Sequence, residues 1–157
     1  MTGAQPAVET RLAELGLTLP PVATPVAAYV PAILQGELVH TSGQLPFQGG
    51  QLAATGKVGA EVDPAQAAEL AALCAVNALA AVKSVIGDLD RVEQVVKVVG
   101  FVASDPSFTG QPQVINGASE LLGQVFGEAG AHARSAVGVA VLPMDAPVEV
   151  EITVRVR

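Results

Sequence analysis

The sequence predicts an α+β domain in which two main helices pack on one face of a mixed β-sheet. Short Val-rich segments with alternating or continuous apolar residues indicate strands, and two long segments with helical periodicity indicate helices. These segments follow in the order ββαβαββ, which segregates the helices on one side of the sheet. Half of the residues are hydrophobic, so we expect residues 1–157 to form a single domain with an aliphatic core.

The first part of the chain, residues 1–24, is predicted to be an N-terminal extension. Apolar residues at helical spacing indicate a short helix over residues 5–16, which Gly16 ends. Pro20 and Pro21 follow. Because proline fixes its backbone angle and lacks an N–H group, they favour an extended arm over a helix.

Two strands are expected next, over residues 26–34 and 37–43, with Gly36 in the turn between them. A Gly-rich segment, residues 48–56, follows the second strand. It has neither the Lys-Ser/Thr ending nor the strand-to-helix context of a phosphate-binding loop. We therefore interpret this segment as a surface turn.

The first main helix is predicted over residues 64–86. Asp63 is suited to cap its N-terminus, and Pro64 fits the first helical position. Gly87 ends the helix. Cys74 lies inside it, with no basic residue nearby in the sequence to lower the pKa of the thiol, so we interpret it as a small buried core residue.

The second half of the chain supplies the remaining elements. Residues 92–103 alternate and then become continuously apolar, which predicts a central strand buried on both faces in its second half. A second main helix is expected over residues 112–128. Two final strands are expected over residues 134–142 and 147–156, joined by a turn that contains prolines.

Composition and charge argue against several functions. The net charge of −7 and only 8 basic residues disfavour nucleic-acid binding, which depends on Lys and Arg. One cysteine allows no intrachain disulfide, and neither a secretory signal nor a span of about 20 apolar residues is apparent. We therefore expect a cytoplasmic protein without membrane association. His40, His132 and Cys74 lack the spacing of metal ligands, so no metal site is expected.

Arg134 is the first candidate functional residue. It opens a predicted strand, directly after the Gly-rich, His-containing segment 127–132, and the rest of the strand is nearly all apolar. A guanidinium in this position either forms a structural ion pair or binds an anion, because its planar fork matches a carboxylate. The pattern alone favours the ion pair, since most charged side chains are solvated or paired.

Glu149 and Glu151 form a second candidate group. They alternate with apolar residues on the last predicted strand, so both carboxylates point to the same face. If that face is buried, the two like charges raise the pKa of one carboxyl group. The pattern alone favours a solvated strand face.

Several short motifs occur in a fixed order over residues 25–157. The most specific are Ser-Gly-Gln-Leu-Pro at 42–46, Arg-Ser at 134–135, Leu-Pro at 142–143 and Val-Glu-Val-Glu at 148–151. In this order and spacing they resemble the Rid/YjgF family, also known as the reactive intermediate deaminase or UK114 family. The longer N-terminus resembles a longer, less characterised branch of that family.

The resemblance implies a chorismate-mutase-like fold and a homotrimer whose sheets form a central barrel, with three pockets at the subunit interfaces. It implies hydrolysis of a reactive enamine or imine, such as 2-aminoacrylate, to a 2-keto acid and ammonia, without a metal or organic cofactor. Arg134 would grip the substrate carboxylate and Glu149 would help to position or activate water. Glu151 would pair structurally or face the barrel. The pocket residues implied by the resemblance are Tyr29, Ser42, Gly43, Asn116 and Arg134.

Three residues depart from the family pattern near Arg134. Ala136 replaces the usual Cys or Thr, His132 replaces the usual Pro, and Gly138 replaces a frequent Glu. These changes keep the carboxylate grip but alter the polarity and volume beside it, and His132 adds a titratable group to the pocket. Two alternatives therefore remain: a non-catalytic trimeric module that binds a small carboxylate metabolite, and an endoribonuclease, which the acidic charge disfavours.

Overall fold

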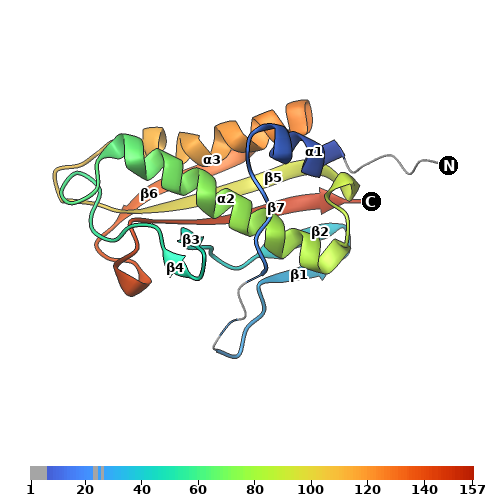
Figure 1. The fold of residues 1–157 in the computed structure, drawn as a ribbon, viewed down its shortest axis with the longest axis horizontal. Helices are drawn as coiled ribbons and strands as arrows, with labels where there is room; N and C mark the ends of the chain where they lie inside the picture. The colour runs from blue at the N-terminus through green and yellow to red at the C-terminus, as the bar shows by residue number, and fades with distance from the viewer. Residues whose placement is uncertain (1–6, 23–24, 26) are drawn as a thin grey trace.

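The computed structural model describes residues 7–22, 25 and 27–157. A short N-terminal helix precedes a sheet covered by two long helices (Figure 1). The helices are α1 (Ala7–Glu14), α2 (Pro64–Ile86) and α3 (Gln111–Phe126), with 3₁₀ turns η1 (Leu89–Arg91), η2 (Gly127–Gly130) and η3 (Pro143–Asp145). The strands are β1 (Ala32–Gln35), β2 (Leu38–Thr41), β3 (Phe47–Gln48), β4 (Gln51–Leu52), β5 (Val92–Ala103), β6 (Ala133–Val139) and β7 (Val148–Val156).

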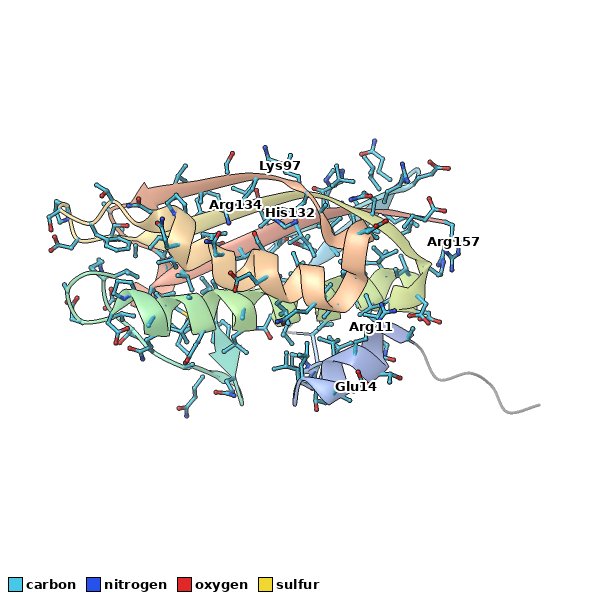
Figure 2. All side chains as sticks on the ribbon, turned by 90° about the horizontal axis from the view of Figure 1, so that it is seen from above. Arg11, Glu14, Lys97, His132, Arg134 and Arg157 are labelled. Carbon is cyan, nitrogen blue, oxygen red and sulfur yellow. The ribbon has the colours of Figure 1, made fainter. Side chains whose placement is uncertain are left out.

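The main sheet has five strands in the order β1-β2-β7-β5-β6. Neighbouring strands are antiparallel except β5 and β6, which run parallel. Helix α2 packs on β7, β1 and β2, and α3 packs on β5 and β6. Both helices lie on the same side of the sheet (Figure 2). The predicted α+β class is therefore confirmed, and the element order is compatible with ββαβαββ.

The hydrophobic core lies between the two long helices and the sheet. Every second residue of β7, from Val148 to Val156, is buried on the helix side of the sheet. Cys74 of α2 is buried in this core, and its burial raises the pKa of the thiol well above the ordinary value. The thiol therefore stays neutral, in agreement with its predicted core position.

Local signals fix both ends of α2. The Asp63 side chain accepts a hydrogen bond of 2.9 Å from the backbone N–H of Gln66, Pro64 occupies the first turn, and Gly87 ends the helix at φ 82°. By length and hydropathy α2 is also able to cross a membrane, contrary to the expectation that the sequence holds no such span. However, 67% of that segment is buried inside the domain, so α2 is its core helix.

Helix α1 of the N-terminal extension is hydrogen-bonded to the rest of the domain at two places. Asp90 in η1 accepts hydrogen bonds from the backbone N–H groups of Ala7 and Val8, at 2.8 and 2.9 Å. Arg11 donates to the carbonyl of Val125 at the end of α3, at 2.8 Å. The predicted helix over 5–16 is thus found over Ala7–Glu14; its residues 5 and 6 lie outside the described residues.

Several predicted boundaries are wrong. The strand expected over 26–34 is found only over Ala32–Gln35, and its residue 26 lies outside the described residues. Segment 48–56 is not a plain turn, since β3 and β4 form a small hairpin around Gly49 and Gly50. The strand expected over 134–142 ends at Val139. Residues 140–142 are not part of it, since the pairing of β6 with β5 stops at Val139.

The sheet face away from the helices, called the open face below, carries exposed apolar side chains. Ile33 of β1 and Val137 of β6 are 56% and 44% exposed. Val99 and Phe101 of β5 pair with Glu151 and Glu149 of β7 on this face and are only half-buried. The prediction that the second half of β5 is buried on both faces is therefore wrong for Val99 and Phe101, because the described residues cover this part of the open face only partly.

Candidate functional site

Arg134 projects from the edge strand β6 toward α3. Its register partner on β5 is Val98, which is fully buried against the helices, so the arginine side chain lies on the helix side of the sheet. Nη1 donates hydrogen bonds to Asn116 Oδ1 at 2.8 Å and to Ser119 Oγ at 3.2 Å. Nη2 donates to the carbonyl of Pro112 at 3.3 Å. Helix α3 thus fixes the plane of the guanidinium.

The charge of Arg134 has no carboxylate partner in the described part of the chain. The ion pairs found there use Lys57, Lys83 and Arg155 instead. The structural ion pair favoured by the sequence pattern is therefore not formed, and all three acceptors of Arg134 are neutral oxygens. Within the described residues the Nε–H and one Nη2–H have no acceptor; we call these two N–H groups the free edge of Arg134, and as donors on a cation they suit a carboxylate.

His132 and Ser119 extend this group along α3. The Nε2 atom of His132 lies 2.9 Å from Ser119 Oγ, and Nδ1 lies 2.6 Å from the carbonyl oxygen of Gly130. Arg134 and His132 lie together beside α3 in Figure 2. We call Asn116, Ser119, His132 and Arg134 the arginine cluster.

Ser119 is the member of the arginine cluster that the sequence reading missed. It lies three residues after Asn116, so both side chains project from the same face of α3. That spacing is the signal that would have found it, once Asn116 was placed next to Arg134.

Glu149 lies on the open face of β7, between the buried Val148 and Val150. After β2 ends, the chain returns to β7 at Gln44, which exchanges backbone hydrogen bonds of 2.8 and 3.0 Å with Val150. Gly43 then lies directly beside Glu149, because a Cβ atom at Gly43 would be 1.9 Å from Glu149 Oε1. Only glycine leaves space for the carboxylate here.

The environment of Glu149 changes its acidity. Partial burial raises the pKa of Glu149 above its usual value, and the negative charge of Glu151 on the same face raises it further. The interpretation of this face as simply solvated is therefore wrong for Glu149, which is half-buried. A carboxylate with a raised pKa is a stronger proton acceptor at neutral pH.

Ser42 precedes Gly43 and is hydrogen-bonded to the two residues that follow Tyr29. The Ser42 N–H donates to the carbonyl of Pro31 at 2.8 Å, and its hydroxyl donates to the carbonyl of Val30 at 2.6 Å. These bonds hold the segment that follows Tyr29 against the Gly43 turn, while the Tyr29 side chain is 58% exposed. We call Tyr29, Ser42, Gly43 and Glu149 the glutamate cluster.

A single chain does not bring the two clusters together. The arginine cluster lies on the helix side of edge strand β6, whereas the glutamate carboxylate lies on the open face of β7. Strand β5 separates the two strands. The implied pocket residues therefore form two half-sites.

Another hollow in the described part of the chain lacks charged side chains. This hollow, of about 390 Å³, lies between the N-terminal arm, the β3–β4 hairpin and α2. Its lining is mostly apolar and contains no charged side chain, so we place the chemistry at the two clusters instead. Across the described ranges, no three His, Cys, Asp or Glu side chains are grouped to hold a metal ion.

Comparison with known proteins identifies the family. The family model described as a YjgF/chorismate-mutase-like endoribonuclease matches residues 9–154. Protein TCP17 of Trypanosoma cruzi is 44% identical over 151 residues, which cover 96% of this chain and 94% of that protein. The chain therefore belongs to the YjgF/chorismate-mutase-like family, and the resemblance seen in its motifs is confirmed.

Solved structures agree with this assignment. The crystal structure of Atu1372 from Agrobacterium tumefaciens, a protein of unknown function, is 51% identical with a TM-score of 0.91, covering 96% of this chain and 94% of that one. Escherichia coli TdcF with bound serine is 29% identical with a TM-score of 0.60, covering 88% of this chain and 94% of that one. The higher TM-score with Atu1372 is consistent with a distinct branch of the family.

Proposed function

We propose that this protein is a hydrolytic deaminase that converts reactive enamine or imine derivatives of amino acids, such as 2-aminoacrylate, to a 2-keto acid and ammonia. The observation that carries the proposal is the part-buried guanidinium of Arg134, which is held by neutral oxygens and keeps one edge free. A part-buried charge is stabilised by a counterion with matching geometry. The carboxylate of an amino-acid derivative supplies that counterion.

We assign the activation of the attacking water to Glu149. It takes a proton from water as the water oxygen bonds to the imine carbon and the C=N electron pair moves to nitrogen, and it then returns this proton to the nitrogen. In the resulting carbinolamine Glu149 carries the hydroxyl proton to the amino nitrogen, so that the C–N bond breaks, ammonia leaves and the C=O bond forms. One water is consumed for each ammonia released, and an enamine first tautomerises to the imine. The imine is already electrophilic, so orientation and proton transfer suffice, without a metal or organic cofactor.

The complete site requires a second copy of the chain, because one chain keeps its half-sites apart. We propose a homotrimer in which the arginine cluster of one protomer faces the glutamate cluster of the next. The exposed apolar side chains of the open face supply a surface for such contacts. Light scattering at micromolar concentration should give three times the 15.8 kDa chain mass, and a monomeric mass would contradict this assembly.

One comparison protein and the residues of β6 are relevant to the alternative functions. TdcF was crystallised with bound serine, which carries the kind of carboxylate that we assign to Arg134. A non-catalytic carboxylate-binding module is favoured by Ala136 and Gly138, because these residues leave no second polar side chain beside Arg134 on its face of β6. An endoribonuclease is disfavoured by the net charge of −7.

The proposed function is tested by generating 2-aminoacrylate enzymatically and following the release of pyruvate and ammonia. Wild-type protein should accelerate both above the spontaneous rate. Binding of pyruvate without acceleration of any of several imino acids would favour the binding module instead. Cleavage of single-stranded RNA by protein free of contaminating nuclease would favour the third alternative.

Gly43→Ala should separate the role of Glu149 from folding. The added methyl group occupies the position of the carboxylate and forces the Glu149 side chain away from the turn. We expect kcat/KM to fall about 10- to 100-fold, since a proton-transfer group contributes about 10²-fold or more. Far-UV circular dichroism should be unchanged. Full activity in this variant would show that the observed carboxylate position is not required.

A further inference from the structure

The direction of each hydrogen bond around His132 follows from its partners. The carbonyl of Gly130 only accepts, so Nδ1 of His132 carries a hydrogen. In the neutral ring Nε2 is then the acceptor, and the Ser119 hydroxyl donates to it. The guanidinium of Arg134 only donates, so Ser119 Oγ accepts from Nη1. A directed series of bonds therefore runs from Arg134 through Ser119 and His132 to Gly130.

Protonation of His132 reverses one bond in this series. With hydrogens on both ring nitrogens, Nε2 becomes a donor to Ser119 Oγ, which then accepts from two cations. The serine hydrogen must turn away from the ring. A second positive charge also arises two hydrogen bonds from the guanidinium. Both changes favour an anion at the free edge of Arg134.

We propose that His132 is a positioning residue that acts through Ser119 and makes anion binding at Arg134 dependent on pH, with tighter binding when the imidazole is protonated. Histidine as a residue type changes its charge between about pH 5 and 8, which sets the two pH values of the test below. The inference rests on the proposed function in one respect, namely that Arg134 binds a carboxylate. A proline at position 132, which the family pattern usually has, offers no such group.

Other charged groups near His132 do not replace it in this role. The elements that adjoin His132 carry Glu120 on α3, Glu128 in η2, Glu93 and Lys97 on β5, and Arg134 on β6. Of these, only Arg134 shares a hydrogen-bond partner with His132 in the described residues. Glu149 also loses charge in acid, and its raised pKa makes it a second source of pH dependence in an assembled pocket. Substitution of His132 separates the two sources.

The test is calorimetric titration of pyruvate, which stays ionised throughout, into the full-length protein at about pH 5.5 and pH 8. Wild type should bind about threefold to tenfold more tightly at the lower pH, as a single added charge at this distance allows. His132→Gln should reduce this ratio to about twofold or less. His40→Gln is the matched control, because it removes the other histidine, which bonds Thr153 on the far side of the sheet, and should keep the wild-type ratio.

A second variant tests the route through Ser119. Ser119→Ala keeps the imidazole and its charge but removes the shared oxygen, so its pH ratio should fall clearly below that of wild type; retention of the full ratio would overturn the route. Nitrogen NMR of His132 should show the Nδ1–H tautomer at high pH, and the opposite tautomer would overturn it as well. Binding that is independent of pH defeats this inference alone. No pyruvate binding by wild type at either pH defeats the anion site itself.

Discussion

Arg134→Ala is expected to lower kcat/KM for 2-aminoacrylate about 10³-fold and to abolish measurable pyruvate binding. Two charge-assisted hydrogen bonds at the free guanidinium edge are worth about 1.5–3 kcal/mol each, and every 1.4 kcal/mol is about tenfold in affinity. Stability should change little, because the side chain forms no ion pair in the described residues and is itself only part-buried. Kinetics, calorimetry and urea denaturation measure the three quantities.

Arg134→Lys is the informative companion variant. Lysine keeps the positive charge but loses the planar fork, so it should recover part of the binding and little of the turnover. The opposite pattern, in which Arg134→Ala unfolds easily but still binds pyruvate normally, would identify a structural arginine. That pattern would contradict the proposed carboxylate grip.

Mixing Arg134→Ala with Glu149→Gln tests whether one site draws on two protomers. Each variant alone should be inactive. In trimers that mix at random from equal amounts, about one quarter of the interfaces pair an intact arginine with an intact glutamate, so activity should return to about that fraction. Co-expression followed by the same pyruvate assay measures it. No recovery in trimers shown to contain both chains would mean that the half-sites do not combine between protomers.

Local sequence signals were sufficient wherever neighbouring residues decide the structure. Asp63 and Gly87 fixed the ends of α2 through a side-chain cap and a left-handed glycine, both of which need only adjacent backbone. The alternation around Glu149 correctly placed its side chain opposite the buried valines. Hairpin β3–β4 was missed because two-residue strands are too short to show alternation.

Contacts between elements far apart in the sequence determine the features that the local patterns did not predict. The pattern favoured an ion pair for Arg134, yet its partners are neutral groups on α3, and nothing in the local sequence indicates which face of α3 the strand meets. The position of Ser119 beside Arg134 depends on the same packing of α3 on β6. Phe101 shows the remaining limit: its apolar character predicts burial, but the described elements of the chain leave it only half-buried on the open face.

Gly117→Ala is expected to destabilise the fold by about 1–3 kcal/mol, because a Cβ atom at Gly117 would lie 1.9 Å from the carbonyl oxygen of Ala68. The obstacle is backbone of α2, which cannot rotate aside as a flexible side chain would. The two helices must therefore separate, which also moves neighbouring Asn116 away from Arg134. Urea denaturation should show the loss as a lower midpoint, and activity should fall with it.

Gly123→Ala is the matched control in the same helix. No atom lies within 4 Å of a Cβ built at Gly123, so alanine meets no obstacle there and gains about 0.8–1 kcal/mol of helix propensity. This variant should be more stable than wild type with unchanged activity. If both glycine variants shift the midpoint in the same direction, contact with Ala68 is not what makes glycine necessary at position 117. If they shift it in opposite directions, contact with Ala68, rather than glycine's effect on helix formation, makes Gly117 necessary.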